Sequence, residues 1–542
     1  MPRPASGAAP ALVAAGLAAL LSVPLPAQET ERSAPLSPGA LAGEVPVRTV
    51  GPAIMSGRVV GIAVATSPGA RGGRLGTVFY VAAASGGVWK TTNGGVSFEP
   101  VFDDAGVGSI GAVATAPTNS NVVWVGTGEA NSQRSSSYGD GVYRSLDGGK
   151  TFEHMGLRAS QHVGKIVVHP EDEDVVYVAA VGPLWAGGGE RGLYRTTDGG
   201  ESWERVLEGA NPWTGVTELV LDPADPDVMY AATYQRMRRA WSFVGGGPGS
   251  GVWKSTDGGE SWTEVTRGLP SSDMGRIGLD VSLSSPHTLY AVVESNEEAG
   301  LYRTDDAGAS WRRVSDIASI PWYFGEVRVD PADPETVYHL GVLLQRSRDG
   351  GETWERIDRG GVHVDHHAMW INPENPENVI LGNDGGLYVT HDGAETWEWA
   401  VDLPISQFYA IGTDMAEPWF GVYGGLQDNN TWGGPSRTRA EEGIFGSDWF
   451  VMAGGDGFFA ALDPTDPNIA YVESQYGVLY RYDRRTGERK LIQPVPRAGE
   501  EEYRFNWSAP VHISPWDSNT LYFAAERVFK SPDRGDSWRR IS

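Results

Sequence analysis

The sequence predicts an all-β protein, a β-propeller of about ten four-stranded blades. Eight copies of an octet, Ser/Thr-x-Asp/Asn-x-Gly-x-Ser/Thr-Trp/Phe, recur along the chain, with Ala394 in place of the glycine in the copy at Thr390, mostly at spacings of roughly 40–60 residues. They start at Thr91, Ser145, Thr196, Ser255, Thr304, Ser347, Thr390 and Ser531. Repetition on this scale indicates an array of similar units, each burying its apolar face against its neighbours. The 72 Gly, 20 Trp and 20 Tyr residues suit a turn-rich β protein with aromatic packing between units.

Each unit is wider than its octet. In the unit around Ser255, an apolar segment ends in a Pro/Asp-rich turn at Glu218–Pro226, and an alternating segment follows from Val228. A short aromatic segment, Gly251–Ser255, then leads into the octet, and a closing segment starts at Trp262. Four short segments separated by turn signals are typical of one propeller blade.

The octet itself is predicted to be a turn between two strands. Gly258 and Gly259 allow the backbone to bend tightly, and Asp257 is expected to accept hydrogen bonds from amides of its own turn. Trp262 is expected to return and pack between blades. The octet therefore predicts architecture and says little about chemistry.

The alternating segments add two units whose octets have decayed, beginning at Trp419 and Ile469. This makes ten blades between about Arg58 and Ser542, and a strand at residues 45–50 is expected to latch the ring, because an open stack leaves exposed edges. A single ten-bladed ring over residues 45–542 is the favoured arrangement. The alternative is a seven-bladed propeller over 45–400, ending near Trp399, followed by three blades of a second one over 401–542.

The N-terminus predicts export. Arg3 precedes an apolar run from Ala8 to Val23, and the small residue Ala27 follows, which together indicate a secretory signal peptide over residues 1–27. Residues 28–44 are rich in Pro, Ser and Glu and are expected to be a disordered spacer. The run is short for a transmembrane helix, and the absence of cysteine excludes disulfides and a lipid-modified cysteine. The expected location is secreted or periplasmic.

The formal net charge of −26 argues against binding to nucleic acids and to anionic membranes. Much of the negative charge lies in the Asp-Pro turns and in the octets, which are expected to face solvent. Solubility outside the cytoplasm explains this charge without an acidic binding site.

These repeats resemble the Asp-box (BNR) propellers over nearly the whole chain, and most closely the sortilin N-terminal domain and its bacterial secreted relatives. The segments that carry the bacterial resemblance are Gly126-Thr-Gly-Glu-Ala-Asn, His363-Val-Asp-His-His-Ala-Met-Trp and Gly424-Gly-Leu-Gln-Asp-Asn-Asn-Thr-Trp. Several such relatives are loosely labelled glycosyl hydrolases, and xyloglucanases with tandem propellers are more distantly similar. The octet does not distinguish enzymes from receptors, because both carry it.

Two enzymatic patterns implied by this resemblance are incomplete. A sialidase would need an arginine triad, of which Arg58 fits one member. A tandem-propeller xyloglucanase would carry an Asp two residues before a Gly-Gly-x-Tyr strand. The first blade has Ala84-Ser85 before its Gly-Gly pair, and the seventh has Asn383 at the matching position with Asp384 one residue late. Because glycosidases usually need two carboxylates, the incomplete pair makes an enzymatic function the less favoured interpretation.

Topology predicts which face of the propeller carries function. The Asp-Pro turns and the octets occupy one face, while loops between the second and third strands and between blades emerge on the other. Three long loops there, Gly128–Asp140, Gly182–Arg191 and Tyr234–Gly249, combine aromatic and basic side chains that suit sugars, carboxylates or peptides. The predicted ligand-binding residues are Glu129, Arg134, Tyr138, Trp185, Arg236, Arg238, Arg239, Trp241 and Phe243. The alternative is that these loops merely cap the channel.

A histidine-rich segment enters the seventh blade. His363, Asp365, His366 and His367 lie within five positions of a chain that has only 10 His. Imidazole and carboxylate ligands would suit zinc or another divalent ion, although the spacing fixes no ligand geometry. The competing interpretation is that His366 or His367 is a buried hydrogen-bonding residue between blades. No other cofactor is expected.

Candidate acid/base residues on the same face are Asp384, Asp428 and Asp456, from blades seven, eight and nine. Without a recognisable catalytic pair, the favoured function is an exported, sortilin-like and non-catalytic propeller that binds a peptide, a protein segment or a glycan. The alternative is a glycoside hydrolase acting on a polysaccharide with paired carboxylates. The sequence does not determine the oligomeric state.

Overall fold

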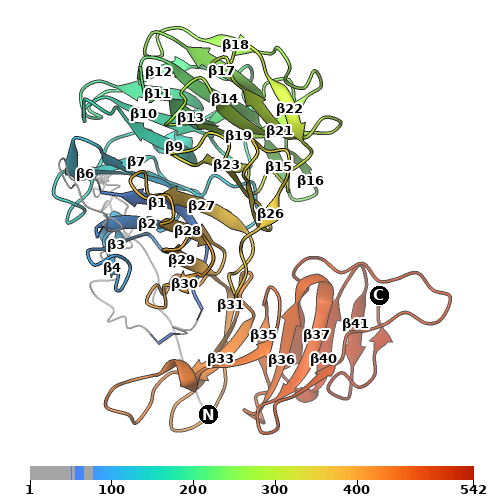
Figure 1. The fold of residues 1–542 in the computed structure, drawn as a ribbon. Helices are drawn as coiled ribbons and strands as arrows, with labels where there is room; N and C mark the ends of the chain where they lie inside the picture. The colour runs from blue at the N-terminus through green and yellow to red at the C-terminus, as the bar shows by residue number, and fades with distance from the viewer. Residues whose placement is uncertain (1–49, 52–54, 66–76) are drawn as a thin grey trace, which may run out of the picture. The chain divides into compact units, whose positions relative to one another are not determined.

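The structure, a computed structural model, describes residues 50–51, 55–65 and 77–542. These residues contain ten four-stranded antiparallel sheets, and within each sheet the strands are hydrogen-bonded in chain order (Figure 1). The predicted all-β fold with ten four-stranded blades is confirmed. The predicted signal peptide, the spacer and most of the latch strand at 45–50 lie outside the described residues.

The first seven sheets share one plan, a meander of four strands of which the last is short. Their strands are β1 (Val59–Val64), β2 (Phe79–Ala83), β3 (Val88–Thr91), β4 (Glu99–Pro100); β5 (Ile110–Ala116), β6 (Asn119–Thr127), β7 (Val142–Ser145), β8 (Glu153–His154); β9 (Val163–Val168), β10 (Val176–Ala180), β11 (Gly192–Thr196), β12 (Glu204–Leu207); β13 (Thr214–Leu221), β14 (Met229–Gln235), β17 (Gly251–Ser255), β18 (Thr263–Val265); β19 (Met274–Val281), β20 (Leu289–Ser295), β21 (Gly300–Thr304), β22 (Arg312–Ser315); β23 (Glu326–Val329), β24 (Val337–Leu340), β25 (Leu344–Ser347), β26 (Glu355–Arg356); β27 (His366–Ile371), β28 (Val379–Asn383), β29 (Gly386–Thr390) and β30 (Glu398–Trp399).

A small hairpin, β15 (Met237–Arg239) with β16 (Ser242–Val244), is inserted between β14 and β17 of the fourth sheet.

The last three sheets repeat the same meander. Their strands are β31 (Phe408–Thr413), β32 (Gly421–Leu426), β33 (Thr431–Pro435), β34 (Phe450–Ala453); β35 (Ala460–Leu462), β36 (Ile469–Ser474), β37 (Val478–Asp483), β38 (Glu488–Leu491); β39 (Val511–Ser514), β40 (Asp517–Ala524), β41 (Val528–Ser531) and β42 (Arg539–Arg540). The helical segments of the described residues are four single 3₁₀ turns, at Asp103–Ala105, Arg158–Ser160, Gly446–Asp448 and Gln475–Gly477.

The first seven sheets close into a ring. The first strand of each sheet packs against the first strand of the next, and β27 and β28 pack back against β1. Val59 and Phe79 of the first sheet share a buried apolar core with Ile380 and Leu387 of the seventh. The favoured single ten-bladed ring is therefore corrected to the alternative of seven blades plus three, because the apolar face of β1 is already covered by the seventh blade.

The three further sheets pack one after another, β31 against β35 and β35 against β39. The segment before β1 contacts the eighth sheet, where the Trp449 indole N–H donates to the carbonyl oxygen of Val50 at 3.0 Å. Ser406 donates to the carbonyl oxygen of Met55 at 2.7 Å. These contacts place the start of the ring beside the first of the three further blades.

The octets form the predicted turns. In the fourth blade, Asp257 accepts hydrogen bonds from the Ser261 amide at 2.9 Å and from its hydroxyl at 2.6 Å. Gly258 and Gly259 have φ of 68° and 89°, in the left-handed region that glycine adopts most readily. Trp262 packs against the apolar core between the third and fourth blades. The structural interpretation of the octet is confirmed.

We expect the ring seam to be sensitive to a single added carbon. A Cβ atom on Gly382 would lie 2.5 Å from Val59 Cγ1, across the contact between blades seven and one. Gly382→Ala should therefore destabilise the protein by about 1–3 kcal/mol, the usual cost of overpacking, measured by urea denaturation. Gly108→Ala is the matched control, because its Cβ would meet no atom closer than 4.0 Å. Equal stabilities of the two variants would contradict this account of the seam.

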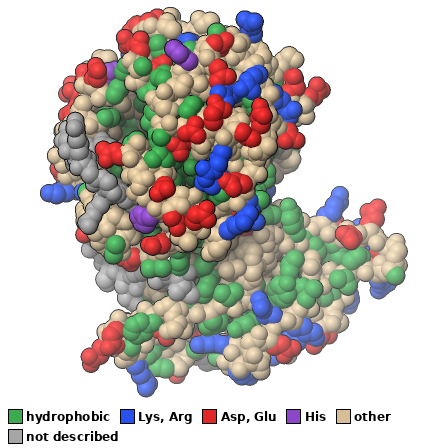
Figure 2. All heavy atoms as spheres, in the orientation of Figure 1, with side chains coloured by type: hydrophobic (Ala, Val, Ile, Leu, Met, Phe, Trp, Pro, Cys, Tyr) green, Lys and Arg blue, Asp and Glu red, His purple; other side chains and the backbone are tan. Residues whose placement is uncertain are grey.

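Figure 2 shows Asp and Glu side chains spread over the visible face in many small groups. Among the described residues there is no helix whose length and apolar character would allow it to cross a membrane.

Candidate functional site

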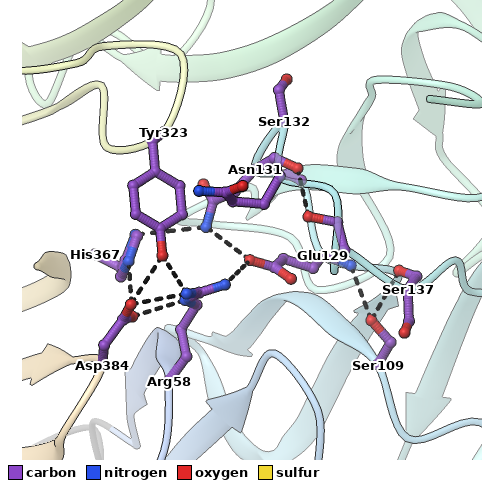
Figure 3. A network of polar contacts seen from close by, with 12 residues as sticks. Arg58, Ser109, Glu129, Asn131, Ser132, Ser137, Tyr323, His367 and Asp384 are labelled. Carbon is purple, nitrogen blue, oxygen red and sulfur yellow. Dashed lines mark hydrogen bonds and ion pairs between the residues drawn. The ribbon is translucent and has the colours of Figure 1, made fainter. Parts of the chain in front are cut away.

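A network of buried polar side chains is centred on Arg58, immediately before β1 (Figure 3). The guanidinium group donates through Nε and Nη2 to the two carboxylate oxygens of Asp384, both at 2.7 Å. Its Nη1 donates to Glu129 at 2.8 Å, and Nη2 also donates to the Tyr323 hydroxyl and, at 3.2 Å, to Asp428. Arg58 thus connects loops of blades two, seven and eight with the segment that enters blade six.

Asp384 is ionised in this network. Burial alone would raise its pKa, but the charges of Arg58 and His367 outweigh burial and hold the pKa well below its ordinary value. His367 Nε2 lies 2.9 Å from one oxygen of Asp384, and the Tyr323 hydroxyl donates to the other at 2.8 Å. The side chain of Asp384 is 1 % exposed and does not line a cleft. An acid/base role for Asp384 therefore stays a prediction, and its burial and its bonds to Arg58 favour a structural role.

Beside the network lies a cleft of about 720 Å³. One wall comes from the seven-bladed ring, including Arg134, Trp322 and Asp365, and the other comes from the three further blades. The remaining lining residues are mainly aromatic rings and side-chain amides, among them Tyr323, Phe408, Tyr409, Phe458, Trp507, Gln133, Gln407, Gln427, Gln475 and Asn506. Flat rings and neutral hydrogen-bonding groups are well suited to sugar rings and their hydroxyl groups.

Three carboxyl groups line this cleft, those of Asp365, Asp428 and Asp456. Burial, followed by the charge of Asp384, raises the pKa of Asp365 to about 6. The same two causes raise the pKa of Asp428 well above its ordinary value. Burial also raises the pKa of Asp456, although the backbone N–H of Asp428, which donates to it at 2.5 Å, opposes that shift.

Asp365 and Asp428 also share an unusual backbone conformation. Their φ angles are 67° and 59°, which non-glycine residues seldom adopt and which tend to cluster at functional sites. One oxygen from each of Asp365, Asp384 and Asp428 lies within 4.8 Å of the others. The cleft therefore contains two carboxyl groups on unusual backbone, both with raised pKa, beside a third whose pKa is lowered.

The histidines that the sequence offers as metal ligands point to separate partners. His363 contacts backbone carbonyls of Val364 and Asp428, at 2.8 and 3.4 Å. His366 lies 3.3 Å from Asp358, and His367 contacts Asp384. Within the part of the chain that the structure describes, the group of side chains close enough to share an ion consists of three aspartates and no histidine. Metal binding by His363, Asp365, His366 and His367 stays a prediction, and we propose no metal here.

Three of the residues predicted to bind a ligand are buried and bonded to other parts of the protein. Arg236 is fully buried and donates to the carbonyl oxygens of Ala130 and Gly182, at 2.7 and 3.1 Å. Arg238 is 7 % exposed and donates to the Ser132 carbonyl oxygen at 2.6 Å. Glu129 is buried against Arg58. The two arginines thus satisfy buried backbone carbonyl oxygens of neighbouring loops, whereas Glu129 accepts a hydrogen bond from Arg58.

The other predicted ligand-binding residues are more accessible. Tyr138, Trp185, Arg239 and Trp241 are exposed but do not line the cleft. Phe243 packs edge-to-face on Trp322, with ring centroids 5.3 Å apart. Of the predicted set, Arg134 lines the cleft, and its guanidinium lies 4.8 Å from the ring centre of Trp507. Ligand binding by the exposed members stays a prediction.

Sequence reasoning missed most of the cleft. Trp322 and Tyr323 lie in the connection between blades five and six, and Trp507 lies in the connection between blades nine and ten. These connections emerge on the face predicted to carry function, but the predicted ligand-binding residues all lie in long loops within blades. Aromatic residues in the blade-to-blade connections are the signal that would have found them.

Glu473, on β36 behind the cleft wall, makes a pH-dependent contribution to stability. It is fully buried, one carboxyl oxygen accepts from the Ala509 amide, and burial raises its pKa from 4.5 to about 8. The folded state therefore keeps a proton that the unfolded state loses, so stability should fall as the pH rises from about 4.5 to 8. Glu473→Gln should reduce this fall in melting temperature between pH 5 and pH 8. An unchanged pH dependence in the variant would contradict the assignment.

Comparison with known proteins reveals similarity to propellers of two functional kinds. A family model described as "Sortilin, neurotensin receptor 3" matches residues 140–276. A xyloglucanase from Paenibacillus sp. is 26% identical over 309 residues, covering 48% of this chain and 27% of that enzyme. A xyloglucanase from Hypocrea jecorina is 27% identical over 359 residues, covering 56% of this chain and 39% of that enzyme. The matches thus span well under half the length of these relatives.

Solved structures with similar folds come from the same group. A GH74 enzyme from Niastella koreensis superposes with a TM-score of 0.55 at 17% identity, covering 91% of this chain and 73% of that one. A GH74 xyloglucanase from Xanthomonas campestris gives a TM-score of 0.52 at 17% identity, covering 91% and 80%. These structures agree with the propeller fold. The xyloglucanase relatives favour the glycoside hydrolase alternative, and non-catalytic, sortilin-like binding is not supported.

Proposed function

We propose that this protein is an exported glycoside hydrolase that cleaves a neutral β-glucan-type polysaccharide such as xyloglucan. The observation that carries the proposal is the meeting of Asp365, from the seven-bladed ring, with Asp428, from the further blades, in one cleft lined by aromatic rings. The similarity to xyloglucanases supports the substrate class. Three carboxyl groups against one arginine, Arg134, disfavour an anionic glycan in this cleft.

The two carboxyl groups take different roles. Asp428 is the general acid, because burial and the nearby charge of Asp384 keep it protonated at neutral pH. It gives its proton to the oxygen of the scissile glycosidic bond. Asp365, whose pKa is about 6, is mostly ionised at neutral pH and serves as the second carboxylate. The aromatic rings of Trp322 and Trp507 bind the sugar faces, and the chemistry needs no cofactor.

The spacing of these groups leads to a stereochemical prediction. Oxygens of Asp365 and Asp428 lie within 4.8 Å of each other. Retaining glycosidases place their carboxyl groups roughly 5–5.5 Å apart, whereas inverting enzymes separate them by about 6.5–9.5 Å to admit a water molecule. Asp365 is therefore expected to attack the anomeric carbon directly, and the products should keep the anomeric configuration of the substrate. Proton NMR of the first products measures this, and inverted products would overturn the role of Asp365 as nucleophile.

The first test is an incubation of the purified chain from Gln28 with xyloglucan, mixed-linkage β-glucan and sialosides, followed by measurement of released reducing ends. Release from the neutral glucans and not from sialosides is the expected result, and Asp365→Asn should abolish it. Absence of release from every glycan would overturn the proposal. Full activity of Asp365→Asn would overturn the assignment of the second carboxylate.

A further inference from the structure

Arg58 is held rigidly by carboxylates that are not available to a substrate. Asp384 binds Nε and Nη2 with both of its oxygens, and Glu129 binds Nη1. Arg58 is 4 % exposed. A planar guanidinium gripped on two sides in this way has almost no freedom to rotate. Its Nη2 group is therefore a fixed donor next to Asp428, which lines the cleft.

That fixed donor also contacts the carboxyl group of Asp428. Nη2 lies 3.2 Å from Asp428 Oδ2, across the boundary between the seven-bladed ring and the eighth blade. The backbone of Asp428 is held as well, because its N–H donates to Asp456 at 2.5 Å. The Asp428 side chain nevertheless stays 22 % exposed toward the cleft. One oxygen of this carboxyl group is thus fixed by the protein while the group as a whole remains accessible.

The charges around Arg58 decide whether the Asp428 carboxyl group carries a proton while it contacts Arg58. The single positive charge already faces two buried carboxylates, Glu129 and Asp384. A third negative charge at Asp428 would be poorly compensated, and burying such a charge is unfavourable. Guanidinium can only donate hydrogen bonds, and the carbonyl oxygen of a carboxylic acid is a stronger acceptor than its hydroxyl oxygen, so the contact favours Oδ2 as the oxygen without the proton. The proton of Asp428 then resides on Oδ1.

We propose that Arg58 is a positioning residue for the reaction: it binds Oδ2 of Asp428 and so directs the acidic proton, on Oδ1, toward the glycosidic oxygen. This inference rests on the proposed hydrolase function and adds a residue to it. Arg58 itself contacts no substrate. It acts by fixing which oxygen of the general acid carries the proton and where that oxygen lies.

The test compares two substrates that differ in their need for an acid. Xyloglucan has a poor leaving group that must be protonated, whereas 2,4-dinitrophenyl β-cellobioside has a leaving group that departs without a proton. Arg58→Lys keeps the charge but loses the forked contact. It should lower kcat on xyloglucan by about 100-fold, the lower range for general acid catalysis, and change kcat on the aryl glycoside far less. Equal losses on both substrates, or no loss on either, would overturn the proposal.

Two further variants sharpen this experiment. Arg303→Lys is the matched control, because Arg303 is also buried and grips a carboxylate, Glu335, with two bonds of 2.6 Å but does not line the cleft. It should leave both rates unchanged. Arg58→Ala, if it folds, should regain xyloglucan hydrolysis when guanidinium ions are added, and if it does not fold, Arg58→Lys decides. A wild-type chain that cleaves neither substrate would instead refute the hydrolase function itself.

Discussion

Asp428→Asn is expected to lower kcat for polysaccharide hydrolysis by about 100- to 10,000-fold, the range that general acid catalysis supplies. The amide has nearly the same size and can still accept the hydrogen bond that Arg58 donates to Oδ2. It has no acidic proton to give to the departing oxygen. The measurement is the initial rate of reducing-end release from xyloglucan, together with the melting temperature of the variant.

A matched control is available on the opposite face of the propeller. Asp257→Asn alters an aspartate of an octet turn that lies outside the cleft, so kcat should not change. A general acid is expected to contribute at least about 100-fold to the rate. If Asp428→Asn kept more than about a tenth of the wild-type rate, the loss would be too small and Asp428 would not be the proton donor. Asp456, which also lines the cleft and has a raised pKa, would then be the next candidate.

Asp384→Ala is expected to destabilise the seven-bladed ring by about 3–5 kcal/mol, the usual cost of removing one partner from a buried ion pair. The substitution removes both hydrogen bonds at 2.7 Å and leaves the Arg58 charge buried with Glu129 as its remaining close partner. Urea denaturation measures the loss. The large effect follows from burial, since the Asp384 side chain is only 1 % exposed.

An exposed ion pair provides the comparison. Lys490 and Asp536 lie 2.7 Å apart with both side chains 47% exposed. Lys490→Ala should therefore change stability by less than about 1 kcal/mol, because water and salt screen such pairs. If Asp384→Ala proved as mild as Lys490→Ala, the Arg58 network would not be a structural element of the ring.

The fold was predictable because its signals are local. Each octet places Asp257 or its equivalent where it can bond amides of its own turn, and the turn then forms wherever the octet occurs. The four short segments of each unit also recur along the chain, separated by turn signals, as a series of propeller blades requires. The change from regular to irregular octets near Trp399 coincides with the end of the ring, but ten similar blades are equally compatible with one larger ring.

The candidate site was less predictable because its residues meet only through long-range packing. Topology predicts Asp428 and Asp456 on one face of the propeller, and both line the cleft. Asp365 was selected for a different reason, its neighbouring histidines. The positive charges of Arg236 and Arg238 predict a binding surface. The sequence does not show that both side chains donate hydrogen bonds to backbone carbonyl oxygens of another loop.

The sequence by itself determined the strands, the turns and the number of blades, because these depend on neighbours within a few residues. The tertiary structure alone decided where the ring closes, since that depends on which apolar face meets β1. It also decided the protonation of the carboxyl groups. Asp384 and Asp428 are both aspartates in similar loops, yet the charge of Arg58 and its two bonds lower the pKa of Asp384, while burial and the charge of Asp384 raise the pKa of Asp428.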